Sequence, residues 1–207
     1  ETSSIDSVDS DYFSYVVAAN TDEVLFKNNL TSHAESFDYR VYADDSGKPW
    51  DSPHGNVIPA DESTPSYLDA PYLDAPLVSL VHGPISTGDA WLADDATETV
   101  GNNVAAYADL VAPQGFSNGD YTAETTSANT FDYAYDETEA EYSVKNRKAA
   151  IVNLFLLNNY LHDEFYDHGF DEASGNAQAL NYGRGGEEGD ALNAEVQDSS
   201  GFNNANM

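Results

Sequence analysis

The last quarter of the chain holds its most hydrophobic stretch, residues 149–168, which begins with an apolar run at 149–157. Its apolar residues recur at steps of three and four, which is the spacing of one helical face: Ile151, Leu154, Phe155, Leu161 and Phe165. Further apolar residues lie between them, so we expect the first half of this helix to be buried on nearly all sides. The helix should begin near Ser143 or Asn146, and Gly169 is a natural position for its end.

Upstream of this helix, hydrophobic residues occur in short runs that predict β-strands. Two such runs, at 12–19 and 23–28, flank a polar Asn-Thr-Asp and predict a β-hairpin. Residues 37–42 alternate between apolar and polar, and residues 77–81 and 192–198 are further strand candidates. The pattern therefore predicts an α+β fold that is rich in strands and has one long buried helix near its C-terminal end.

Acidic residues outnumber basic ones by 37 to 7, so this chain of 207 residues carries a formal charge of −30. A field of that sign repels nucleic acid and anionic lipid, which excludes both as partners. Hydrophobic residues make up 41% of the chain, which is enough for a core and argues against disorder. The sequence has no cysteine and no run of 18 apolar residues, so we expect neither disulfides nor a membrane span.

Two histidines on the predicted helix raise the question of a metal site. His162 and His168 lie six residues apart, whereas zinc-binding helices place two histidines four apart. With Asp163 and Asp167 nearby, a metal site is one interpretation, and a hydrogen-bonded structural histidine is the simpler one. No His-Glu dipeptide occurs, so the chain holds no H-E-x-x-H motif and we expect no zinc catalysis from it alone.

Acidic residues gather at three places and offer the oxygen ligands that Ca²⁺ prefers. These places are Asp44 with Asp45, Asp94 with Asp95, and the group Asp132, Asp136, Glu137 and Glu139. None follows the spacing of an EF-hand loop, and a solvated acidic coat without a specific ligand is the alternative for each. Ca²⁺ is therefore a candidate cofactor on charge alone.

A glycine-rich segment, Asn-Tyr-Gly-Arg-Gly-Gly at 181–186, has the composition of loops that cradle phosphate. It lacks the G-x-x-x-x-G-K spacing, and the neighbouring carboxylates of Glu187, Glu188 and Asp190 would repel a phosphate. We interpret this segment as a tight turn that links the helix to the following strand.

The end of the chain places Asn-Asn-Ala-Asn, at 203–206, after the predicted strand 192–198. Short polar residues beside a strand suit an exposed sheet edge that can pair with an extended peptide. A plain polar tail is the alternative interpretation of the same residues.

Several motifs follow one another in a fixed order through residues 149–207. They are Asn-Asn-Tyr-Leu-His-Asp at 158–163, Asn-Tyr-Gly-Arg-Gly-Gly at 181–186, Glu-Val-Gln-Asp at 195–198 and Asn-Asn-Ala-Asn at 203–206. Gly-Asn-Asn-Val at 101–104 adds an earlier match. Together they closely resemble the fungalysin family of secreted zinc metalloproteases, which belongs to the thermolysin-like superfamily.

The resemblance implies the β-rich N-terminal lobe of a thermolysin-like metalloprotease, whose last strand borders the substrate cleft. It makes Asn203, Asn204 and Ala205 the substrate-binding residues, with the side chain and main chain of Asn204 and the main chain of Ala205 contacting the peptide. The zinc motif, the general-base glutamate and the third zinc ligand would all lie beyond Met207. We therefore expect no catalytic and no zinc-binding residue in this chain, and no activity from it alone.

The resemblance also predicts how the chain is organised. Residues 1–32 would be the hairpin that ends a propeptide, and residues 33–207 would be the incomplete N-terminal lobe of the catalytic domain. The expected partners are a peptide or protein substrate, the protein's own propeptide and the C-terminal helical lobe of the same protein. The full-length protein would then be a secreted zinc metalloendopeptidase. A non-catalytic, acidic, β-rich surface or adhesion module is the alternative.

Overall fold

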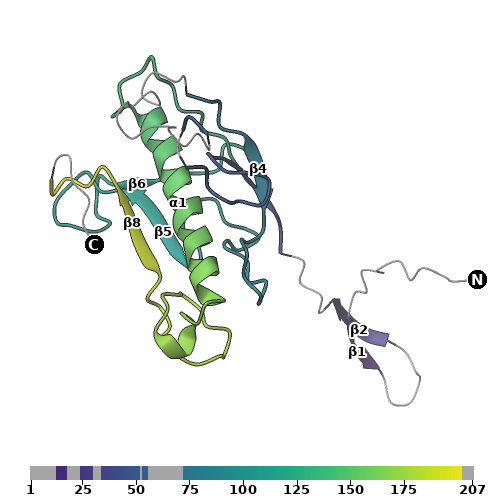
Figure 1. The fold of residues 1–207 in the computed structure, drawn as a ribbon. Coiled ribbons are helices and arrows are strands. Elements are labelled where there is room, and N and C mark those ends of the chain that lie inside the picture. Colours follow the sequence, from purple (N-terminus) through teal and green to yellow (C-terminus); the bar gives the residue numbers. More distant parts are fainter. Residues whose placement is uncertain (1–12, 18–23, 30–33, 52, 56–71, 202–207) are drawn as a thin grey trace, which may run out of the picture. The chain divides into compact units, whose positions relative to one another are not determined.

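The structure is a computed structural model that describes residues 13–17, 24–29, 34–51, 53–55 and 72–201 (Figure 1). The chain divides into two compact units, residues 1–34 and residues 35–207. In the first unit, β1 (Phe13–Val17) pairs antiparallel with β2 (Val24–Asn29), so that Phe13 lies opposite Asn29. The two strands predicted on either side of Asn-Thr-Asp therefore pair as expected.

The described residues of the second unit form two small sheets of three strands each. In the first, β3 (Phe37–Arg40) pairs antiparallel with β4 (Leu77–Leu80) and parallel with β7 (Thr130–Phe131). The alternation predicted for β3 is present, because Phe37 and Tyr39 are buried whereas Asp38 and Arg40 are not.

The second sheet has the strand order β6-β5-β8. Its central strand β5 (Val104–Ala108) pairs antiparallel with β6 (Tyr121–Thr122) and parallel with β8 (Leu192–Val196). Parallel pairing joins strands that are far apart in the sequence, and the connection between β5 and β8 includes the long helix.

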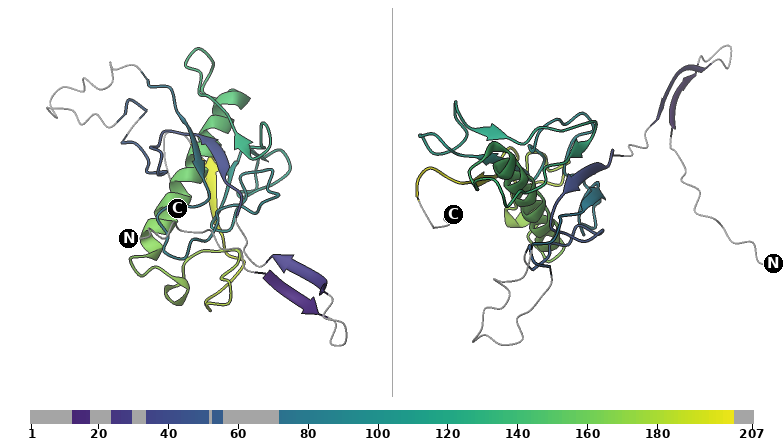
Figure 2. Two further views of the ribbon diagram at one scale, coloured as in Figure 1. Left: turned by 90° about the vertical axis from the view of Figure 1, so that its right-hand side faces the viewer. Right: turned by 90° about the horizontal axis from the view of Figure 1, so that it is seen from above.

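The long helix is α1 (Val144–Tyr166), which is 23 residues long and begins where the sequence predicts. Ser143 is its N-cap, and the Ser143 side chain accepts a hydrogen bond from the Asn146 backbone N–H. The helix ends at Tyr166 with Asp167 as its C-cap, two positions before the predicted end, and Gly169, with a φ of +97°, lies in the turn that follows. Figures 1 and 2 show α1 running along β5 and β8, and it also contacts β3. With small mixed sheets around one helix, the predicted α+β class with β-rich character is confirmed.

The buried face of α1 differs from the predicted one. Residues at steps of three and four do line the core, but they are Ala149, Val152, Leu156, Asn159 and Asp163, joined by Ile151 and Phe155. Leu157, Leu161 and Phe165 are 39%, 39% and 54% exposed, so one side of the second half of the helix is open, whereas residues 146–156 of the first half are buried or half-buried as expected. The pattern misled because apolar residues occupy both faces of this helix.

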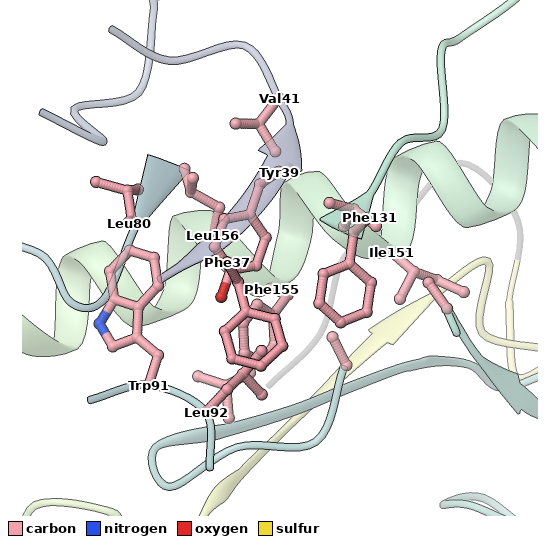
Figure 3. Close-up of a cluster of buried hydrophobic side chains, with 14 of the residues drawn as sticks. Phe37, Tyr39, Val41, Leu80, Trp91, Leu92, Phe131, Ile151, Phe155 and Leu156 are labelled. Carbon is pink, nitrogen blue, oxygen red and sulfur yellow. The ribbon is translucent and has the colours of Figure 1, made fainter. Parts of the chain in front are cut away.

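The core between α1 and the first sheet is aromatic (Figure 3). Tyr39 stacks on Phe131 and on Phe155, with ring centroids 5.6 and 6.1 Å apart, and meets Trp91 edge-on at 6.2 Å. All four side chains are fully buried, so these rings pack α1 against β3, β7 and the loop at Trp91. Among the described residues, no helix is long and apolar enough to cross a bilayer.

Candidate functional site

Strand β8 leads toward the predicted substrate-binding residues. Within the described part of the chain it lies at the edge of its sheet, beside β5, and its first two residues, Leu192 and Asn193, are exposed. An edge strand presents backbone N–H and C=O groups that an extended peptide can pair with. Asn203, Asn204 and Ala205 lie outside the described residues, so their assignment stays a prediction.

A turn of two asparagines holds the start of β8 in place. The backbone carbonyl of Asn103 accepts a hydrogen bond from Leu192 N at 2.8 Å, and that of Asn102 accepts one from Ala179 N at 2.7 Å. The Asn102 side-chain oxygen also accepts the N–H of Leu180 at 2.8 Å. The Gly-Asn-Asn-Val motif therefore fixes β8 and the segment before it.

Asp163 on α1 connects this turn to a second loop. Its Oδ2 accepts hydrogen bonds from the Trp91 indole N–H at 2.8 Å and from Gly83 N at 2.7 Å. Its Oδ1 accepts one from the Asn103 side-chain amide at 3.4 Å. Asp163 is fully buried, so these donors replace the water that its carboxylate loses on folding.

The two histidines of α1 have local contacts. His162 Nδ1 lies 3.2 Å from Asp163 Oδ1, and His168 Nδ1 lies 2.6 Å from the backbone carbonyl of Glu164. Among the described residues, neither histidine belongs to a group of three or more side chains that could hold a metal. These contacts favour the structural interpretation of both residues.

The glycine-rich segment at 181–186 is a turn built around Glu172. Arg184 Nε donates to Glu172 Oε1 at 2.6 Å, and the Arg184 guanidinium also pairs with Asp89. Gly186 has a φ of +77°, and a Cβ at this position would meet the Glu172 carbonyl oxygen at 2.5 Å. The arginine is thus held by carboxylates of the protein itself, which supports the interpretation as a turn.

Tyr166, the last residue of α1, completes the surroundings of Glu172 by donating its hydroxyl to Oε2 at 2.8 Å. Burial alone would raise the pKa of Glu172, but the hydrogen bonds from Arg184 and Tyr166 outweigh it and lower that pKa. Burial and the contact with Glu172 raise the pKa of Tyr166 to about 12. Both groups therefore keep their ordinary charge at neutral pH.

At each of the three acidic clusters proposed from the sequence as Ca²⁺ sites, carboxylates bind to other groups of the protein. Asp44 caps the turn at residues 46–48, and Asp94 accepts the N–H of Glu35. Asp132 pairs with Arg40, and Asp136 pairs with Lys145. In the described residues no metal-binding group forms around Asp44 and Asp45, Asp94 and Asp95, or Asp132, Asp136, Glu137 and Glu139.

One group of carboxylates that the sequence does not reveal does come together. Oxygens of Asp109, Glu195 and Asp198 all lie within 4.8 Å of one another. Asp109 follows β5, Glu195 lies near the end of β8 and Asp198 follows that strand, so the parallel pairing of β5 and β8 brings distant parts of the sequence together here. The one hint in the sequence is the alternation of side chains along β5, which would place Asp109 on the same side as Tyr107, two positions before it.

A model of the family described as fungalysin metallopeptidase (M36) matches residues 56–207, which is more than half of the chain. The chain belongs to the fungalysin family. The match covers the edge strand, the asparagine turn and α1, and it confirms the family inferred from the motifs.

Fungal relatives extend the similarity toward the N-terminus. The chain is 32% identical to extracellular metalloproteinase 2 of Trichophyton tonsurans over 201 residues, which cover 94% of this chain and 27% of the relative. It is 35% identical to extracellular metalloproteinase MEP of Fusarium vanettenii over 135 residues, covering 62% and 21%. The chain thus spans about a quarter of the length of the curated relatives it matches. Their names agree with the predicted secretion of this protein.

Fungalysins are metallopeptidases, and zinc is the metal expected for the family. The described residues of this chain do not fit zinc, because their one group of potential ligands consists of three carboxylates and contains no imidazole or thiolate. The sequence likewise contains no H-E-x-x-H motif. The described residues instead form an edge strand, β8, which the Asn102–Asn103 turn and Asp163 hold in position.

Proposed function

We propose that this chain is the N-terminal part of the catalytic domain of an extracellular zinc metalloendopeptidase and forms one wall of its substrate cleft. The main observation in support is that β8 lies at the edge of its sheet and that Asn203, Asn204 and Ala205 follow it closely in the sequence. Membership of the fungalysin family supports peptide-bond hydrolysis by the whole protein over a non-catalytic adhesion module.

In this proposal the chain binds and orients the substrate backbone. An extended peptide adds to the sheet edge through main-chain hydrogen bonds, with Asn204 contributing its side chain as well. Zinc, when bound, polarises the scissile carbonyl and activates water. The zinc ligands and the general base lie beyond Met207, so the chain alone is inactive.

The exposed face of α1 supports the existence of a partner lobe. Leu157, Leu161 and Phe165 lie at steps of four on one side of the helix and remain 39–54% exposed. Contiguous exposed apolar residues are typical of surfaces that another segment covers. The relatives are about four times as long as this chain, and we assign the covering segment to the C-terminal helical lobe beyond Met207.

The hairpin of β1 and β2 is assigned to the end of a propeptide, residues 1–32, with the catalytic lobe occupying residues 33–207. The pairing of these strands with each other supports a self-contained element at this position. Cleavage of the full-length zymogen should then fall shortly before β3.

Replacing Asn204 tests the proposed role of the edge. In the full-length protein, Asn204→Ala should lower kcat/KM for a peptide substrate about tenfold or more, roughly 1.4 kcal/mol of lost transition-state stabilisation. The matched control is Asn193→Ala, which removes an exposed asparagine of β8 and should leave kcat/KM close to that of the wild type. Unchanged kinetics of Asn204→Ala would remove this residue from the substrate site.

A further inference from the structure

The ends of β5 and β8 form an acidic site on the side of the sheet that faces away from α1. Val104, Ala106 and Ala108 of β5 belong to the core beneath α1. Side chains alternate along a strand, so Tyr107 and Asp109 project from the opposite face. Glu195 is the register partner of Tyr107, and the Tyr107 hydroxyl donates to Glu195 Oε1 at 2.8 Å.

The irregular backbone directly after β8 brings a third carboxylate, that of Asp198, to the same side. In a regular strand, Asp198 would point to the face opposite Glu195. Gln197 has a φ of +51°, which ends the regular alternation, and its side chain is held by Arg147 Nε at 2.6 Å and by the Glu141 carbonyl at 3.0 Å. The carboxylate of Asp198 consequently lies within 4.8 Å of those of Glu195 and Asp109.

Asp109 has an oxygen that no described residue satisfies. Its side chain is fully buried, and Oδ2 accepts the N–H of Gly115 at 2.9 Å, but Oδ1 has no hydrogen-bond partner among the described residues. An unpaired buried carboxylate oxygen is costly, and two further carboxylates close to it add like-charge repulsion. A positive ligand among the three carboxylates would remove both costs.

We propose that Asp109, Glu195 and Asp198 bind a divalent cation, and that this cation is Ca²⁺. The group offers only oxygen ligands, which suits a hard cation and disfavours zinc. Ca²⁺ accepts irregular arrangements of six to eight oxygens, so water can fill the positions that three carboxylates leave open. Tyr107 and Ser200, which donate hydrogen bonds to Glu195 and Asp198, orient two of these ligands.

Bound Ca²⁺ would join the ends of two parallel strands. Ser199 N already donates to the Asp109 carbonyl at 2.8 Å, so the chain after β8 passes directly beside the site. The cation would therefore stabilise the segment that enters the predicted substrate-binding residues. The proposal does not depend on the peptidase activity, because Ca²⁺ binding can be measured without a substrate.

Terbium luminescence and thermal unfolding of the full-length protein test the site, with zinc kept at one fixed concentration in every sample. Tb³⁺ replaces Ca²⁺ at oxygen sites and emits when a nearby tyrosine is excited, and Tyr107 contacts a proposed ligand. We expect a saturable Tb³⁺ signal that Ca²⁺ displaces, and a rise in Tm of about 5 °C or more at saturating Ca²⁺.

Asp109→Asn and Glu195→Gln should abolish both effects, and without Ca²⁺ their Tm should equal or exceed that of the wild type because repulsion is relieved. A purely structural Asp109 would instead make Asp109→Asn less stable under all conditions. The matched control Asp95→Asn removes an exposed carboxylate elsewhere and should keep both effects. Equal Ca²⁺ responses in all variants would indicate general screening of charge and would overturn the proposal. If Asp109→Asn fails to fold, Glu195→Gln decides alone.

Discussion

Each of the two faces of α1 carries some residues that are usually found on the other. The face packed in the core includes Asn146, Asn159 and Asp163, whereas Leu157 and Phe165 on the other face are exposed. Two of these buried polar residues connect the helix to other segments, because Asn146 and Asp163 each make several hydrogen bonds outside it. One face therefore fixes the loops around the helix, and the other face is left for a partner.

The largest expected effect separates two phenylalanines of the same helix. Phe155 is fully buried against Tyr39, whereas Phe165 is 54% exposed. Phe155→Ala should lower the free energy of unfolding by about 3–5 kcal/mol, because it leaves a cavity in an aromatic core. Phe165→Ala in the same 207-residue chain should change it by about 0.5 kcal/mol or less. Chemical denaturation monitored by Trp fluorescence measures both.

The same pair sharpens the proposal of a partner lobe. If the chain beyond Met207 covers the exposed face of α1, Phe165→Ala should become destabilising in the full-length protein, by roughly 2 kcal/mol or more. An equal, small effect of Phe165→Ala in both forms would show that this face stays in solvent.

The sequence predicts that α1 exists and where it begins, because Ser143 is a good N-cap and apolar residues follow at helical spacing. It does not predict the buried face, since Ile151 and Phe155 share the pattern with the exposed Leu161 and Phe165. The burial of Asp163 depends on donors from Gly83 and Trp91, which lie far away in the sequence. No local pattern carries that information.

The acidic site cannot be predicted from the sequence either, because it also depends on contacts between distant residues. Asp109, Glu195 and Asp198 stand beside one another only through the parallel register of β5 and β8 and the irregular conformation of Gln197. The acidic pairs that stand out in the sequence lie in loops, where Asp44, for example, accepts the backbone N–H groups of Ser46 and Lys48. Clustering in sequence was therefore a poor guide to clustering in space.

A smaller effect is expected from the polar part of the buried face. In Asp163→Asn, the amide oxygen can still accept from Gly83 and Trp91, but the amide nitrogen then faces the Asn103 side-chain amide, which is also a donor. We expect a loss of about 1–3 kcal/mol in the free energy of unfolding, measured by denaturation.

The matched control for that variant is Asp167→Asn, four residues further along. Asp167 is exposed and accepts hydrogen bonds from the neighbouring loop at Ser86, so its replacement should cost about 0.5 kcal/mol. Equal losses in Asp163→Asn and Asp167→Asn would contradict the view that the buried face specifies the loops.

The smallest expected effect concerns pH, at the end of α1 where Tyr166 meets Glu172. Hydrogen bonds from Arg184 and Tyr166 lower the pKa of Glu172 in the folded protein, against the effect of burial. A lowered folded pKa contributes stability above the unfolded value of about 4.3 and loses it as pH falls through the folded pKa. In urea unfolding between pH 6 and pH 3, at about unit steps, the wild type should therefore lose stability more steeply than Glu172→Gln. Glu187→Gln removes an exposed carboxylate from the neighbouring loop and should follow the wild-type slope. Parallel slopes for the wild type and Glu172→Gln would contradict this, because they would mean that the pKa of Glu172 is the same in the folded and the unfolded protein.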